Sequence, residues 1–198
     1  MIMSPTAYPS ALPALENLFT GKLVRLTAAT KADRPTFIAW RDDAEYLRQL
    51  DGGPAVPAPR ESYEREPASD ARPHENRNEF EFAIRTLADD TLIGIGGLDA
   101  WNSNHQDCWA WIGIGNPNYR GKGYGTDAMR LLVGYAFREL NMHRVTLSVF
   151  SYNLRAMRSY EKVGFVHEVT QRAALYRDGQ RYDQHMMGLL RPDWEAAR

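Results

Sequence analysis

Apolar and polar residues alternate along this chain with two different periods, and the period predicts the type of each element. A period of two, which is typical of half-buried strands, recurs before the middle of the chain. The predicted strands cover 22–29, 79–87, 91–101 and 108–115. Residues 31–50 instead place apolar side chains at helical spacing, and Pro35 lies near the start of that predicted helix, where proline is tolerated.

The second half of the chain alternates helices and strands. A helix is predicted over 126–140, with a buried face of Ala128, Leu131, Leu132, Tyr135, Ala136 and Leu140 and a polar face of Asp127, Arg130, Gly134 and Arg138. A strand follows over 144–150, and a short helix begins at the N-cap Asn153 and ends at Gly164. Two last strands flank the turn at Asp178 and Gly179. This order predicts an α+β fold with a mixed sheet.

Two segments depart from the periodic pattern. Residues 1–20 contain three prolines and little periodicity, which predicts an N-terminal arm. Residues 51–78 are rich in proline and in mixed charges, so we expect a loop insertion that is either an active-site lid or a plain surface loop. The remaining chain, 21–198, has the length of a single domain.

The amino-acid composition argues against several classes of protein, namely nucleic-acid binders, membrane proteins and secreted proteins. The 24 basic and 25 acidic residues give a formal net charge of -1, so the totals lack the basic excess of a nucleic-acid binder. No apolar run of about 18 residues predicts a membrane span, and the N-terminus lacks the pattern of a secretory signal. The single cysteine, Cys108, cannot form an internal disulfide, which fits a reducing compartment. We therefore expect a cytoplasmic protein without nucleic-acid or membrane partners.

The strongest chemical signal is the sequence YRGKGYGT, Tyr119–Thr126, between a predicted strand and a predicted helix. Its three alternating glycines permit positive φ and let the backbone approach a ligand closely. The first turn of a helix offers unpaired N–H groups and a partial positive charge, to which Arg120 and Lys122 add full charges. Together these features predict a site for a phosphate or diphosphate.

Two common phosphate-binding motifs do not fit this loop. A P-loop requires four residues between its first two glycines, and five separate Gly115 from Gly121. Gly123 also occupies the position of the hydroxyl residue that would bind magnesium. The dinucleotide fingerprint G-x-G-x-x-G fails as well, because the third glycine comes one residue early and the motif lies past the middle of the chain.

A third pattern fits. RGKGYG matches R/Q-x-x-G-x-G/A, with Arg120, Gly123 and Gly125 in the fixed places. Downstream, the sequence NLRAMRSYEKVGF carries Asn153 and Tyr160 about two helical turns apart, on one face. The two motifs resemble the GNAT superfamily of acyl-CoA-dependent N-acetyltransferases, in particular ribosomal-protein N-terminal and spermidine acetyltransferases. The resemblance extends over roughly 22–190 and is strongest over 112–165.

The resemblance implies a GNAT-like fold, in which a mixed, mostly antiparallel central sheet is flanked by helices and contains a β-α-β core that binds acyl-CoA. It also implies roles for individual residues. The loop would hold the diphosphate of coenzyme A, Asn153 would contact the pantetheine arm, and Tyr160 would protonate the departing thiolate. The implied cofactor-binding residues are Ile112, Ile114, Arg120, Gly121, Lys122, Gly123, Tyr124, Gly125, Thr126 and Asn153. Asn153 as a helix cap alone and Tyr160 as a packing residue alone remain alternatives.

The reaction implied is direct transfer of an acetyl group from acetyl-CoA to a primary amine in a ternary complex, without a metal or a cysteine nucleophile. A backbone N–H of 111–115 would polarise the thioester carbonyl. Asp99 is the preferred base among several candidates, which include Glu81, His105 and Asp107. Trp101 is a candidate lining residue of the acceptor pocket.

The sequence leaves the acceptor open between a small amine and a protein N-terminal α-amine. It also leaves open a non-catalytic function, in which the same fold binds or senses CoA without turnover. A homodimer is a further possibility that the sequence does not decide.

Overall fold

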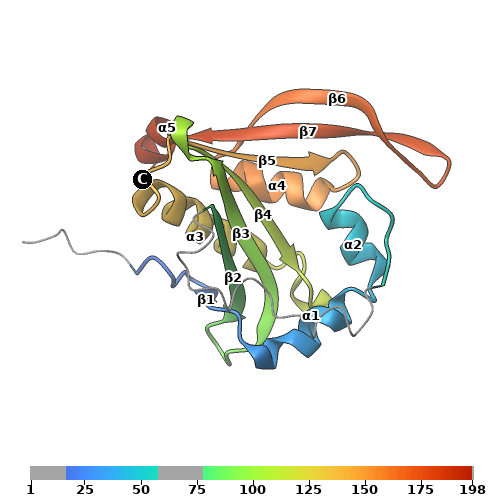
Figure 1. Ribbon diagram of the computed structural model, residues 1–198, viewed down its shortest axis with the longest axis horizontal. Helices are drawn as coiled ribbons and strands as arrows, with labels where there is room; N and C mark the ends of the chain where they lie inside the picture. The colour runs from blue at the N-terminus through green and yellow to red at the C-terminus, as the bar shows by residue number, and fades with distance from the viewer. Residues whose placement is uncertain (1–16, 58–77, 198) are drawn as a thin grey trace, which may run out of the picture.

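The computed structural model describes residues 17–57 and 78–197, except for the side chains of 101–103. Within these residues the chain forms one seven-stranded sheet in the order β1-β2-β3-β4-β5-β7-β6 (Figure 1). The strands are β1 (Val24–Thr27), β2 (Glu79–Thr86), β3 (Leu92–Asn102), β4 (Asp107–Ile114), β5 (Arg144–Phe150), β6 (Val166–Arg177) and β7 (Gln180–Leu190). All neighbouring strands are antiparallel except β4 and β5, which confirms the mixed, mostly antiparallel sheet.

Helices flank the sheet and join its strands. The α-helices are α1 (Arg34–Trp40), α2 (Ala44–Leu50), α3 (Tyr124–Arg138), α4 (Leu154–Val163) and α5 (Arg191–Ala196). Short 3-10 helices are η1 (Lys31–Asp33), η4 (Ser103–His105) and η5 (Pro117–Tyr119). As expected, Asn153 caps α4, and Gly164 ends it in the left-handed conformation at φ +113°. Helix α5, which the sequence pattern did not predict, packs Trp194 on Phe137.

The single helix predicted over 31–50 is wrong, because the chain breaks between α1 and α2. Asp43 begins α2 as its N-cap, and its carboxylate accepts a hydrogen bond from the Tyr46 N–H at 3.1 Å. The other carboxylate oxygen binds Arg120 at 2.8 Å. The side chain of Asp43 thus starts a new helix and at the same time ties it to the loop before α3.

Helix α3 is buried on more of its circumference than its sequence predicted. Asp127 and Gly134, assigned to the polar face, are both buried. The Asp127 carboxylate is only 5% exposed and accepts hydrogen bonds from the backbone N–H groups of Leu23 and Val24, at 2.7 and 3.1 Å. A buried carboxylate is tolerated when such donors satisfy it, so Asp127 joins the start of α3 to the first strand.

The two parallel strands, β4 and β5, separate soon after they meet. They pair only where 107–109 face 144–146. Beyond this point β4 continues to pair with β3 as far as Ile114, while no strand of the described residues pairs with its other edge. The sheet therefore opens next to the end of β4, and backbone groups there are left to bind other partners.

Two segments named in the sequence analysis lie partly outside the described residues, namely 1–16 of the arm and 58–77 of the loop insertion. The described end of the arm packs on the sheet and on α3, where the Phe19 ring centre lies 6.1 Å from that of Phe82 in β2 and 5.9 Å from that of Tyr135 in α3. None of the helices in the described residues has the length and apolar character needed to cross a membrane.

Candidate functional site

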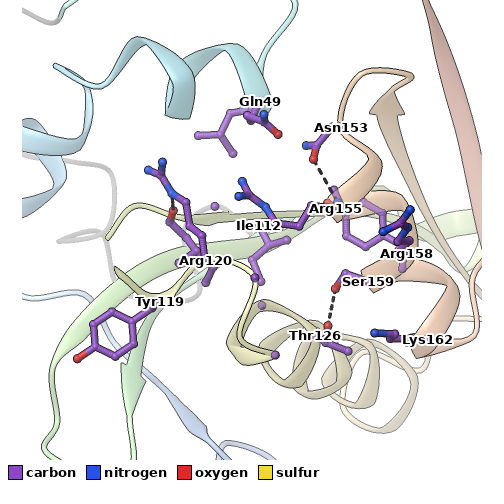
Figure 2. Close-up of a pocket in the computed structure, with 18 of the residues that line it drawn as sticks. Gln49, Ile112, Tyr119, Arg120, Thr126, Asn153, Arg155, Arg158, Ser159 and Lys162 are labelled. Carbon is purple, nitrogen blue, oxygen red and sulfur yellow. Dashed lines mark hydrogen bonds between the residues drawn. The ribbon is translucent and has the colours of Figure 1, made fainter. Parts of the chain in front are cut away.

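A cavity of about 400 Å³ lies where β4 and β5 separate (Figure 2). Its walls come from α2, the end of β4, the glycine loop, the first turn of α3 and one face of α4. The lining residues include nine of the predicted site residues, which are Ile112, Ile114, Arg120, Gly121, Gly123, Gly125, Thr126, Asn153 and Tyr160. The structure thus brings together two motifs that are separated by some thirty residues of sequence.

The glycine loop has the backbone conformation that its sequence predicts. Gly121 and Gly123 adopt φ values of +74° and +93°, in the left-handed region where a side chain is strained. Gly123 is the N-cap of α3, so the N–H groups of the first helical turn begin at the cavity wall. Thr126 in that turn shares a hydrogen bond of 2.7 Å with Ser159, which holds α3 against α4.

Arg120 differs from the expectation that its charge stands open to a phosphate. One guanidinium nitrogen donates to the Asp43 carboxylate at 2.8 Å and to the Gly115 carbonyl at 2.7 Å. The Nε–H donates to the Ile114 carbonyl at 2.8 Å. The Arg120 side chain therefore closes the open end of β4 and fixes the loop, while Asp43 balances its charge.

The cations that face the cavity come instead from α4. Arg155, Arg158 and Lys162 line it from positions three and four residues apart, on one helix face (Figure 2). The sequence analysis did not predict these three residues, although their spacing could have indicated that they share one face of the helix. Lys122 and Tyr124, which were predicted to bind cofactor, are not among the lining residues. Tyr124 packs edge-on against Tyr119, and Lys122 is exposed.

Asn153 and Tyr160 face the cavity from α4, as their spacing predicted. The Asn153 side-chain oxygen Oδ1 accepts a hydrogen bond from the Ala156 N–H at 3.1 Å, and the residue is only 8% exposed. Asn153 therefore caps α4 and lines the cavity at the same time. Burial raises the pKa of the Tyr160 hydroxyl to about 12, so the phenol keeps its proton at neutral pH. A group that is protonated at neutral pH is suited to donate a proton.

The carboxylates considered as bases, Glu81 on β2, Asp99 on β3 and Asp107 on β4, are not among the residues that line the cavity. Asp99 pairs in register with Glu79, and burial together with the Glu79 charge raises the Asp99 pKa. Partial burial and the charges of Glu79 and Asp99 also raise the Glu81 pKa. Trp101 belongs to β3, but its side chain lies outside the described residues.

Cys108 has no features of a nucleophile. It lies in β4 and is 1% exposed. Burial, with smaller effects from the neighbouring carboxylates of Asp107 and Asp99, raises the pKa of its thiol to about 12. A thiol that is protonated and buried is a poor nucleophile.

The comparison with protein families decides the identity of this fold. A model of the acetyltransferase (GNAT) domain matches residues 24–166. The chain belongs to the GNAT acetyltransferase family. The match covers both motifs and the whole described wall of the cavity, from α2 to α4.

Relatives of this GNAT chain are named as N-acetyltransferases. "Probable N-acetyltransferase YjcK" of Bacillus subtilis is 38% identical over 122 residues, which make up 61% of this chain and 67% of the relative. Spermidine N(1)-acetyltransferase of Escherichia coli is 30% identical over 146 residues, 71% of this chain and 76% of the relative. The alanine N-acetyltransferase of ribosomal protein uS5 from the same species is 25% identical over 126 residues, 63% and 64% of the two chains.

Solved structures share the same architecture. The spermidine N-acetyltransferase of Vibrio cholerae, in complex with CoA and spermine, superposes with a TM-score of 0.74 over 87% of this GNAT chain and 98% of the other, at 23% identity. Identity this low supports the fold alone. Together with the named relatives, the family makes this chain an acyltransferase that acts on an amine, and it does not support the non-catalytic alternative.

Proposed function

We propose that this enzyme transfers an acetyl group from acetyl-CoA directly to a primary amine, with both substrates bound at once. One observation carries the proposal: a single cavity contains the glycine loop at the start of α3 and Tyr160 of α4. A diphosphate bound at the loop would direct the rest of CoA along the open edge of β4 toward Tyr160. The acceptor would enter from the side of α2.

The residues of the cavity fit acetyl-CoA. Amide N–H groups at the start of α3 form an anion site with backbone of positive φ, and the cations of α4 add charge for phosphate oxygens. The edge of β4 at Ile112, which no described strand pairs on the β5 side, offers backbone groups to an amide-containing arm, whereas the Ile114 carbonyl already binds Arg120. Acetyl-CoA supplies the activated thioester, and the chain supplies binding, alignment and proton movement.

Alignment accounts for much of the proposed rate acceleration, because a held thioester and a held amine react as if at high effective concentration. A backbone N–H at the end of β4 would stabilise negative charge on the carbonyl oxygen. Tyr160 would then donate its proton to the departing thiolate sulfur. Asn153 would hold the pantetheine arm beside it.

The amine must lose a proton before or during the attack. A lysine-like amine has a pKa of about 10.4 and an α-amino group about 7.7–8.0, so only the first needs a strong base. We propose Asp99 as this base, acting through bound water, since its raised pKa improves its basicity. Glu81 is the competing candidate on the same sheet face.

The named relatives suggest two kinds of acceptor to test, spermidine and a peptide that begins with alanine. We expect acetyl-CoA to yield free thiol with at least one of them, at a rate that depends on enzyme concentration. Gly123→Glu is the matched control, because it places a side chain and a negative charge in the proposed diphosphate site. Absence of thiol release with every primary amine, in a protein that binds CoA, would refute the catalytic proposal.

A further inference from the structure

The cavity of the candidate site is cationic, although the chain as a whole carries a formal net charge of -1. Among the described residues that line it there is no aspartate or glutamate, and the basic ones are Arg120, Arg155, Arg158 and Lys162. Asp43 balances the charge of Arg120. The side chains of the other three, all on α4, form no hydrogen bond or ion pair with a described residue. Unpaired cations in a cavity without carboxylates indicate an anionic ligand.

Two of these cations lie beside the first turns of α3, where the diphosphate site is proposed. Ser159 shares a hydrogen bond of 2.7 Å with Thr126 in the first turn of α3. Arg158 immediately precedes Ser159, and Lys162 lies about one helical turn after it. The Arg130 guanidinium, in the second turn of α3, donates to the Lys162 carbonyl at 3.2 Å. Arg158 and Lys162 therefore lie next to the diphosphate site, on its α4 side (Figure 2).

The third cation, Arg155, lies at the other end of the helix. It is in the first turn of α4, two residues after the N-cap Asn153. Asn153 is the residue that we propose to hold the pantetheine arm. The position of Arg155 therefore places it closer to the arm of CoA than to the nucleotide end.

The chemistry of CoA indicates which anionic group these two cations would bind. CoA has two separate phosphate groups, a diphosphate and a monoester on the 3′ position of the ribose. Backbone N–H groups at a helix start bind a diphosphate without side-chain charge. A phosphate monoester carries about -1.5 to -2 charges at pH 7 and has three acceptor oxygens. A guanidinium, which can bind two oxygens at once, and an ammonium together match it in charge.

We propose that Arg158 and Lys162 bind the 3′-phosphate of CoA, so that the enzyme discriminates CoA from dephospho-CoA, which lacks this group. This inference rests on the proposed function and adds a specificity subsite to it. Both residues are exposed, so salt should screen their attraction for the phosphate. The preference for CoA should therefore decrease as the ionic strength rises.

Four variants and a control test the subsite. Arg158→Ala and Lys162→Ala, alone and combined, remove the charges, whereas Arg158→Lys combined with Lys162→Arg keeps both. Arg172→Ala is the matched control, because it removes one positive charge at an exposed site on β6 that does not line the cavity. The affinities for CoA and for dephospho-CoA are measured by calorimetry on each protein. Thermal unfolding verifies that the variants fold.

We expect the wild type to bind CoA roughly 30-fold more tightly than dephospho-CoA. Each alanine variant should lower this ratio about fivefold, and the double alanine variant should bring it within about twofold of equality. The affinity for dephospho-CoA should stay within about twofold of wild type throughout, because that ligand does not reach the two cations. The charge-conserving variant should keep most of the preference, and Arg172→Ala should match the wild type.

Three results would overturn the proposal. The first is equal affinity of the wild type for CoA and dephospho-CoA. The second is a preference that persists in the double alanine variant, because other residues would then bind the 3′-phosphate. The third is an equal loss of affinity for both ligands in the alanine variants, because the cations would then bind a group that both ligands share.

These binding measurements need no turnover, so they separate this inference from the proposed function. If the wild type releases no thiol with any primary amine but prefers CoA to dephospho-CoA through these residues, the catalytic proposal fails and the subsite stands. If thiol is released and the two affinities are equal, the subsite fails and the catalytic proposal stands. A wild type that binds neither ligand would refute both.

Discussion

Tyr160 has two properties at the residue scale that together favour a chemical role: it lines the cavity, and burial raises its pKa to about 12. Both come from its place on the inner face of α4, where its ring packs against Phe165 at 6.0 Å. A residue that only packed would not need to line the cavity. Its hydroxyl is the one group of the described cavity wall for which we propose proton donation.

Tyr160→Phe removes that hydroxyl and keeps the ring, so packing and CoA binding should persist. We expect kcat to fall about 100-fold, with CoA affinity by calorimetry within about twofold of wild type. The acid must be protonated to act, and its pKa is about 12. Its ionisation should therefore cause no loss of wild-type activity between about pH 6 and pH 9. Full activity of Tyr160→Phe would show that Tyr160 is not the general acid.

The proposed base, Asp99, predicts how activity depends on pH in the acidic range. A base acts only when deprotonated, so activity should fall as the pH drops through the Asp99 pKa, which lies above its ordinary value of 3.8. Asp99→Asn should lower kcat about 100-fold with a lysine-like amine and less with an α-amine, whose own pKa is lower. Glu81→Gln is the comparison. If Glu81→Gln loses activity and Asp99→Asn does not, the base is Glu81 and not Asp99.

At the scale of elements, the site depends on how α2 is held against the β6–β7 hairpin. Arg177 is the main contact, since it bonds three backbone carbonyls and the Tyr152 hydroxyl. The two elements lie more than a hundred residues apart in sequence, but they meet beside the cavity. Acceptor binding should therefore respond to a residue that lies outside the described cavity wall.

Arg177→Ala should raise the KM for the amine roughly three- to tenfold, because α2 loses its fixed position. CoA affinity should change little, since none of the Arg177 hydrogen bonds reaches the glycine loop or a residue that lines the cavity. Arg181→Ala, in the same hairpin, is the matched control, because Arg181 bonds Ala173 and stacks on Tyr176 instead. Equal amine kinetics in the two variants would contradict the role of Arg177.

At the scale of elements, the sequence could predict local features but not how distant elements pack together. The glycine loop, the Asn153 cap and the Gly164 stop are signals within a few residues, and each was found where expected. The wall formed by α2 could not be predicted, since it depends on tertiary packing. Arg120 shows the limit clearly: its charge is visible in the sequence, but its partner Asp43 lies 77 residues earlier.

For the whole molecule, the sheet order and the separation of β4 from β5 create the site. The seven strands of the described residues provide the frame, and we propose that CoA binds in the opening between two of them. The α+β class followed from the order of elements in the sequence. The length of the β4–β5 pairing did not, because local periodicity contains no information on where two strands diverge.

The central claim is that the backbone amides from Gly121 to Thr126 bind the diphosphate of CoA. A crystal structure of the protein with CoA tests it most directly. We predict diphosphate oxygens within about 3 Å of amide nitrogens in this segment, with the thiol end near Tyr160. A complex in which the diphosphate lies elsewhere and the loop contacts no ligand would contradict the account.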